Sequence, residues 1–206
     1  MIEPKNFDCL LATTKSVLLE LIDTAPFLHK YVFVGGSALT LYLCHRQSED
    51  IDFFTYADNF DRLEILNYIK RFEHKEILND NGNQLDLLLC GVKVTFFNAN
   101  WAFLKPDKPD KFNIATLKSI AILKVNVLFL RAKYRDYYDL YFLVKEVISI
   151  RVLFESSKQI ITGITYKLFC IALLYIDDIA DDNIAHLQPK ELISKAAIRD
   201  FFQNKL

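Results

Sequence analysis

Residues 31–54 read YVFVGGSALTLYLCHRQSEDIDFF, and this stretch decides the fold. The apolar, β-branched and aromatic run Tyr31–Val34 predicts a buried strand. Gly35 and Gly36 then permit a sharp turn. The apolar run after them predicts a short helix, with Ser37 at its N-cap. A loop and a second strand complete the unit.

The turn and the second strand together suit a nucleoside triphosphate and its metal ions. A helix N-terminus presents unpaired N–H groups and the positive end of the helix dipole, so we expect phosphates at Gly35, Gly36 and Ser37. Asp50 and Asp52 stand two residues apart on a predicted strand, so both carboxylates point to one face. Carboxylates beside bound phosphates suit Mg²⁺. Each feature alone would be an ordinary turn or a solvated strand end, but together they predict a triphosphate site.

The order of these residues resembles the signature of a known family. The stretch GGSAL at 35–39, followed by HRQSEDIDFF at 45–54, is similar to that of the AbiEii/AbiGii-type nucleotidyltransferase toxins. These toxins are part of the DNA polymerase β-like nucleotidyltransferases. The resemblance implies that Asp50 and Asp52 are catalytic metal ligands for one or two Mg²⁺ ions. It also implies that Arg46 binds substrate, together with the glycine turn.

A second motif carries the same resemblance. Lys124, then RAKYRD at 131–136, then Asp139-Leu140 match the second signature of that family. The resemblance implies that this helical segment closes over the nucleotide, with Lys124, Arg135 and Asp139 binding substrate and Asp136 or Asp139 supplying a catalytic acid. Without the resemblance, the same residues would favour a ladder of ion pairs on the surface of one continuous helix.

The third catalytic carboxylate is where the sequence departs from the wider superfamily. Many nucleotidyltransferases carry it on the strand that corresponds here to GVKVTFF at 91–97, where Thr95 stands instead. Asp86 is the nearest acid on the predicted strands. Three candidates therefore remain, which are Asp86, Asp136 and Asp139.

The rest of the pattern predicts an α+β protein in two parts. We expect helices over 7–24 and 61–72, and a meander of strands over 74–97 that turns at Asn81-Gly82. A proline-containing linker at 101–111 divides the chain into domains at 1–105 and 106–206. The resemblance makes the first a polymerase β-like nucleotidyltransferase domain, with a mixed sheet flanked by helices. The second is predicted to be a helical bundle that contributes the Lys124 and Arg135-Asp136-x-x-Asp139 motif.

Charge and composition limit the partners. The 206 residues carry a formal net charge of −1, so contact with nucleic acid would need a local patch. The lysines at the domain junction would suit an RNA backbone or a solvated linker; these are Lys105, Lys108, Lys111 and Lys118. No apolar run is long enough to span a bilayer, the N-terminal MIEPKNFD is no signal peptide, and the four cysteines lack metal or disulfide spacing. We expect a cytoplasmic protein with reduced thiols and no membrane partner.

These expectations combine into one reaction. An NMP group passes from an NTP to an acceptor hydroxyl, and pyrophosphate is released. The resemblance implies RNA such as tRNA as the acceptor, a toxin role, and a separately encoded antitoxin. Two alternatives remain: a catalytically inactive module that binds nucleotide or a partner, and transfer to a protein or small molecule. The acidic run at 177–182 would suit a metal but is more typical of a solvated helix end.

Overall fold

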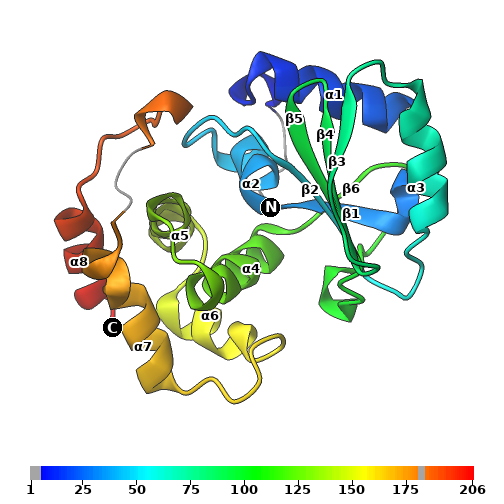
Figure 1. Cartoon of the computed structure of the whole chain (residues 1–206). Coiled ribbons are helices and arrows are strands. Elements are labelled where there is room, and N and C mark those ends of the chain that lie inside the picture. The colour runs from blue at the N-terminus through cyan, green and yellow to red at the C-terminus, as the bar shows by residue number, and fades with distance from the viewer. Residues whose placement is uncertain (1–5, 181–183) are drawn as a thin grey trace. The chain divides into compact units, whose positions relative to one another are not determined.

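The computed structural model describes residues 6–180 and 184–206 (Figure 1). Residues 1–5, on which the signal-peptide expectation mainly rests, lie outside the described residues. Asp181 and Asp182, the last two aspartates of the acidic run, lie outside them as well. The chain divides into two compact units, which meet between Thr116 and Leu117.

In the described part of the chain, no helix has both the length and the apolar composition that crossing a bilayer requires.

The N-terminal unit is built on one six-stranded sheet with the order β3-β4-β5-β2-β1-β6. β1 runs antiparallel to β2, whereas β2 runs parallel to β5, so the expected mixed sheet is confirmed. The predicted meander is also confirmed, because β3, β4 and β5 are consecutive antiparallel neighbours. The strands are β1 (Tyr31–Val34), β2 (Ile51–Thr55), β3 (Lys75–Asp80), β4 (Gln84–Leu89), β5 (Val92–Phe97) and β6 (Asn113–Ile114).

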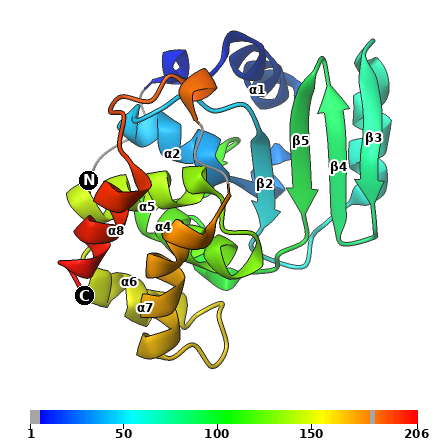
Figure 2. The ribbon, with the colours of Figure 1, turned by 60° about the vertical axis from the view of Figure 1, so that its left-hand side comes forward.

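Alternation along β2 gives the sheet a buried face and a more open face. Ile51 and Phe53 are fully buried, and the Phe53 ring stacks on Phe96 of β5 with centroids 5.3 Å apart. Asp52 and Phe54 point to the opposite face and are only half-buried. In Figure 2 the teal helix behind β3 is α3. The face that carries Asp52 is the one available for chemistry.

Three α-helices, and the 3₁₀ turn before the first of them, accompany this sheet in the described part of the N-terminal unit. The helix expected over 7–24 is interrupted at residues 10–11, where extended backbone separates a 3₁₀ turn from α1. The helix expected over 61–72 is shorter and ends in a 3₁₀ turn, and the carboxylate of Asp61 caps it by accepting a hydrogen bond from Glu64 N (2.9 Å). The segments are a 3₁₀ turn (Phe7–Cys9), α1 (Ala12–Thr24), α2 (Gly35–Leu43) and α3 (Arg62–Tyr68).

A short strand, β6, extends the N-terminal unit to Thr116, beyond the expected domain end at residue 105. It pairs in parallel with β1, and the side-chain amide of Asn113 donates to the carbonyls of His29 (3.1 Å) and Tyr31 (3.3 Å). The proline-containing linker therefore returns to the sheet of the N-terminal unit, and the C-terminal unit begins only after β6. A strand of only two residues is too short to show an alternation of apolar and polar side chains, so the sequence pattern did not reveal β6.

The C-terminal unit is helical, as predicted. Three of its helices begin at a Ser or Thr whose hydroxyl accepts a hydrogen bond from the first turn, which satisfies one unpaired N–H group in each. Its interior is aromatic and includes Tyr137, Tyr138 and Phe142. The helices are α4 (Leu117–Leu130), α5 (Tyr134–Glu146), α6 (Ile150–Ser157), α7 (Tyr166–Leu174) and α8 (Lys195–Gln203).

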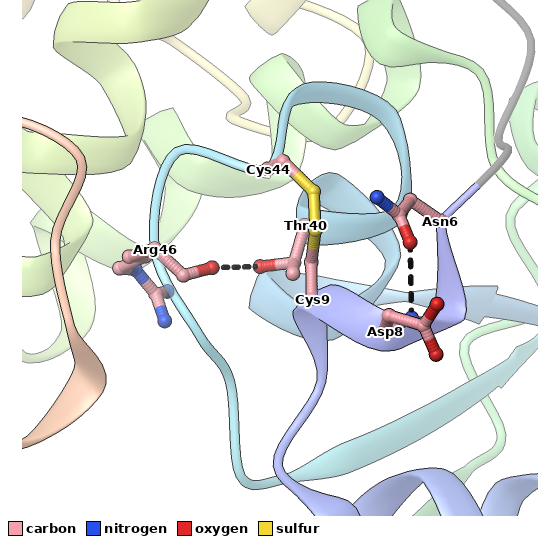
Figure 3. Close-up of a disulfide and its surroundings, with 6 residues drawn as sticks. All are labelled: Asn6, Asp8, Cys9, Thr40, Cys44 and Arg46. Atoms are coloured by element: carbon pink, nitrogen blue, oxygen red, sulfur yellow. Dashed lines mark hydrogen bonds between the residues drawn. A yellow bond between two sulfur atoms is a disulfide. The ribbon is translucent and has the colours of Figure 1, made fainter.

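Cys9 and Cys44 form a disulfide, so the expectation of reduced thiols is wrong for this pair (Figure 3). Their Cα atoms lie 5.6 Å apart, within the range that a disulfide spans. The bond joins the first 3₁₀ turn to the C-cap of α2, where Cys44 has a φ of 46°. The two cysteines are 35 residues apart, and only the fold brings them together. Cys90 and Cys170 carry free thiols, as expected.

Replacing Cys9 with serine should lower the free energy of unfolding by about 3–4 kcal/mol, because an uncrosslinked unfolded chain has more conformational freedom. Urea unfolding of both proteins without reductant measures the difference. Cys90→Ser is the matched control, since its exposed thiol is free, and should change stability little. An identical unfolding midpoint for the wild type with and without reductant would contradict the assignment.

Candidate functional site

The glycine turn begins α2 directly. The helix starts at Gly35 and its N-cap is Val34, so Ser37 is the third helical residue and the expected N-cap role is wrong. Gly35 has a φ of +78°, a region that residues with a Cβ rarely adopt, which explains why glycine ends β1. The first-turn N–H groups of a helix have no partner within the helix. Gly35, Gly36 and Ser37 therefore supply the amides at this helix end.

Ser37 uses its side chain to hold the loop that follows α2. Its buried Oγ shares a hydrogen bond with Ser48 Oγ (2.9 Å) and donates to the carbonyl of Asp50. Two more hydroxyls hold the same loop. Thr40 Oγ1 donates to the Arg46 carbonyl (3.0 Å, Figure 3). Thr14 Oγ1, on α1, donates to the carbonyl of Glu49 (3.0 Å). The backbone carrying Arg46 and Asp50 is therefore fixed to α1 and α2.

The Asp52 carboxylate lies against Gly35. Asp52 is the β2 partner of Val34, the residue just before the turn. A Cβ built on Gly35 would overlap Oδ2 of Asp52. The absence of a side chain at this position therefore lets the carboxylate approach the first turn of α2.

Arg46 brings positive charge to the same helix end. It is 4% exposed, and its Nη1 donates to the carbonyl of Gln47 (2.8 Å). A Cβ on Gly36 would lie 2.6 Å from Arg46 Nη2, so the guanidinium occupies the space above the second glycine. The helix dipole and this side chain both favour an anion at the start of α2.

The two aspartates match the ligands that magnesium takes in a nucleotide site. Asp50 immediately precedes β2, and Asp52 is its second residue. No group of three acidic, histidine or cysteine side chains that would hold a metal occurs in the part of the chain that the structure describes. Magnesium that arrives with a nucleotide needs only one or two carboxylates, because phosphates and water complete its octahedron. The donor set therefore fits such an ion.

Asp86 shares the open sheet face with Asp52. Asp52 pairs with Thr95 across β2 and β5, and Thr95 pairs with Asp86 across β5 and β4, so all three point the same way. Thr95 Oγ1 donates to Asp86 Oδ1 (2.7 Å), and Gln84 Nε2 donates to both carboxylate oxygens (3.0 and 2.9 Å). Hydrogen bonds thus fix the orientation of the Asp86 carboxylate, which lies on β4, the strand next to the one that carries Thr95.

In the C-terminal unit, the second motif forms a buried ion cluster. Lys124 Nζ lies 3.0 Å from Asp136 Oδ1 and 2.6 Å from Asp139 Oδ2. Lys124 is 5% exposed and both aspartates are fully buried, so the alternative of a solvated ladder is wrong. The motif does not lie on one unbroken helix, because α4 ends at Leu130 and α5 begins at Tyr134. The break lets a lysine of one helix meet two aspartates of the next.

Asp136 is held ionised within this cluster. It also accepts from the Arg131 guanidinium (3.4 Å) and from the backbone N–H of Lys133 (3.3 Å), at the start of α5. Burial would raise the pKa of Asp136, but the attraction of Lys124 and Arg131 outweighs burial and lowers that pKa below its ordinary value.

The structure thus gathers the predicted site residues into two groups. The N-terminal unit holds the residues of the glycine turn and the aspartate pair, which are Gly35, Gly36, Ser37, Arg46, Asp50 and Asp52. The C-terminal unit holds Lys124, Asp136 and Asp139, with Arg135 half-buried in the first turn of α5. Sequence reasoning missed Ser48 and Thr40 as loop anchors, because isolated hydroxyls carry no periodic signal.

Comparison with protein families confirms the resemblance for the part of the chain that carries the first motif. Residues 16–86 match the model of the family described as nucleotidyl transferase AbiEii toxin, type IV TA system. A curated relative, the uncharacterized protein aq_aa25 of Aquifex aeolicus, is 27% identical over 197 residues, which cover 90% of this chain and 95% of that protein.

Two solved structures from Helicobacter pylori share the fold. The structure of JHP933 is 18% identical, with a TM-score of 0.52, and the match covers 92% of this chain and 89% of that one. A putative nucleotidyltransferase is 19% identical, with a TM-score of 0.56, and the match covers 92% of both chains. At these identities the likeness shows the fold alone, which agrees with the expected α+β nucleotidyltransferase fold.

Proposed function

Because this chain has the nucleotidyltransferase fold and resembles the AbiEii toxins in its motifs, we propose that it transfers an NMP group from an NTP to an acceptor hydroxyl. Pyrophosphate is the second product. The observation that carries the proposal is the approach of the Asp52 carboxylate to Gly35, at the start of α2. It brings together a helix end that favours phosphate and carboxylates that favour the cation bound to phosphate.

The residues of the turn have separate roles. The N–H groups at the start of α2 and the Arg46 guanidinium bind the phosphates, so that negative charge developing on pyrophosphate meets donors already in position. Asp50 and Asp52 would hold Mg²⁺, which when bound neutralises phosphate charge and aligns the reacting oxygens. Ser37 contributes its backbone, since its hydroxyl holds the loop.

The third carboxylate has three candidates with different surroundings. Asp86 lies on the same sheet face as Asp52 and is oriented by Thr95 and Gln84. Asp136 accepts from three different residues, one of them through a backbone N–H, which favours a role in fixing the start of α5. We therefore propose Asp86 first and Asp139 second. Lys124 and Arg135 remain proposed substrate-binding residues through the resemblance alone.

The acceptor and the biological role follow only from the resemblance. RNA such as tRNA is the proposed acceptor, and the family description supports a toxin role with a separately encoded antitoxin. The cytoplasmic location remains a prediction.

Replacing Gly35 with alanine should reduce transfer roughly a hundredfold, because the new Cβ displaces the Asp52 carboxylate from its productive position. Gly82→Ala is the matched control: Gly82 has a similar φ of +85°, but nothing lies within 4 Å of its added Cβ. Both variants carry the same backbone strain, roughly 1–2 kcal/mol. Initial rates of both variants, normalised to folded protein, measure the effect. Equal rates would show that the Gly35–Asp52 contact does not matter.

A second candidate function is nucleotide binding without transfer, which Thr95 favours by standing where many relatives in the superfamily carry an acid. The two functions separate in one experiment. Purified protein is mixed with Mg²⁺, each NTP in turn and total cellular RNA, and both NTP binding and pyrophosphate release are measured. We expect release with at least one NTP. Saturable binding with no release above that of an Asp52→Asn control would establish the binding module instead.

A further inference from the structure

We propose that the open sheet face beside Asp52 binds the single-stranded end of an RNA acceptor by stacking its bases on four aromatic side chains. The four are Phe54, Phe97, Trp101 and Phe103, and we call them the aromatic platform. The proposal rests on the proposed function and adds the form of the acceptor and the side from which it enters.

The four rings of the platform form one continuous cluster. The Phe54 and Phe97 centroids are 5.1 Å apart, and Trp101 lies 6.0 Å from each of them. Phe103 stacks on Trp101 at 5.9 Å. All four are half-buried, whereas Phe53 on the other face of the same strand is fully buried. The platform therefore keeps ring surface accessible, which a sheet core does not.

The register of the strands puts the platform next to the aspartates. Phe54 follows Asp52 by two residues on β2, so it shares its face and lies about 7 Å further along the strand. Phe97 is the direct β5 partner of Phe54, just as Thr95 is the partner of Asp52. Aromatic and catalytic residues thus form two neighbouring rows on one sheet face.

The direction of the reaction favours the acceptor over the NTP as the platform's occupant. On β1, Val34 is opposite Asp52 and Val32 is opposite Phe54, so the platform and Gly35 lie on opposite sides of Asp52. If pyrophosphate leaves from the Gly35 side, an in-line displacement brings the attacking hydroxyl from the other side. That path passes over the platform.

The chemistry of the patch suits single-stranded nucleic acid. Bases stack on aromatic side chains whatever their sequence, and single strands expose the faces that a duplex hides. An exposed lysine is available for a phosphate beside the rings: Lys105 follows the 3₁₀ turn (Ala102–Leu104) that carries Phe103. Rings and this lysine together match an RNA strand better than an apolar protein segment.

The chain provides its own probe, because Trp101 is its single tryptophan. The full-length protein is titrated with a single-stranded oligoribonucleotide about ten nucleotides long, without NTP or Mg²⁺, and tryptophan fluorescence is recorded. A stacked base quenches an indole, so we expect saturable quenching that weakens with added salt. Addition of NTP and Mg²⁺ without the oligonucleotide should leave the signal unchanged.

Two variants separate stacking from stability. Phe97→Leu keeps an apolar side chain but removes the ring, and should bind the oligonucleotide roughly tenfold more weakly. Tyr166→Leu removes an exposed ring from α7 of the C-terminal unit and should bind like the wild type. Thermal unfolding checks that both variants are folded. If Phe97→Leu is unfolded, the milder Phe103→Leu is used, and the same weakening is expected.

Three outcomes would overturn the proposal. The first is unchanged fluorescence at oligonucleotide concentrations that saturate binding. The second is wild-type affinity in the ring variants. The third is full quenching by NTP and Mg²⁺ alone, which would assign the platform to the base of the NTP. These results do not depend on turnover. Binding without any transfer would refute the proposed function and leave the platform, whereas transfer to RNA with unchanged affinity in Phe97→Leu would refute only the platform.

Discussion

Asp52→Asn is expected to reduce nucleotidyl transfer by roughly a thousandfold or more while the protein stays folded. Asparagine has nearly the shape of aspartate, so it fits against Gly35 where the carboxylate lies. It lacks the negative charge that would hold the cation bound to the triphosphate. The measurement is the initial rate of pyrophosphate release at saturating NTP, with circular dichroism to check the fold.

Asp80→Asn is the matched control for this prediction. Asp80 lies at the end of β3 and pairs with Arg62, away from the row that contains Asp52. Its loss should leave the rate within about twofold, because an exposed ion pair contributes little. Turnover in Asp52→Asn within tenfold of the wild type would falsify the assigned role of Asp52.

Lys124→Met is expected to produce the largest loss of stability, about 3–5 kcal/mol at neutral pH. The lysine is the shared partner of two fully buried aspartates, and methionine would leave both charges buried near each other. Urea unfolding at pH 7 measures the loss. Lys145→Met is the control: its ion pair with Glu191 is solvent-exposed on both sides, so the loss there should stay below about 1 kcal/mol.

The dependence of this loss on pH tests its cause. The pKa of Asp136 is lower in the folded protein than in the unfolded chain, so its stabilising contribution is complete above the unfolded value, near 3.9. That contribution disappears as pH falls through the folded pKa. The deficit of Lys124→Met should therefore shrink as the pH is lowered, because protonation neutralises the aspartates that the variant leaves without their lysine, and substituting both aspartates with asparagine should restore much of the stability. A deficit that is independent of pH would point to lost packing instead.

Local signals were sufficient to predict the centre of the fold. Two glycines between an apolar run and an alternating run predicted strand, turn, helix and strand, because only glycine readily adopts the φ of Gly35 and only a strand puts Asp52 and Ile51 on opposite faces. The hairpin at Asn81-Gly82 was equally local. The position of Asp52 beside the helix end follows from these features.

Features that depend on long-range contacts could not be predicted in the same way. The disulfide joins residues far apart in sequence, and no spacing indicates the pair. Strand β6 exists because β1 offers it a free edge. The burial of Lys124 depends on the break between α4 and α5, which turns a pattern typical of a surface helix into an internal cluster. In each case the residue type was visible, but its environment is set by tertiary packing.

Transfer of label from an α-labelled NTP tests the central claim most directly. Wild-type protein and Asp50→Asn/Asp52→Asn are incubated with Mg²⁺, each labelled NTP in turn, and total cellular RNA and protein offered together. The account predicts label on RNA with at least one NTP, lost in the double variant and after chelation of the metal. Label on protein alone would contradict the RNA acceptor, and the absence of label on any acceptor, despite measurable NTP binding, would contradict the transferase itself.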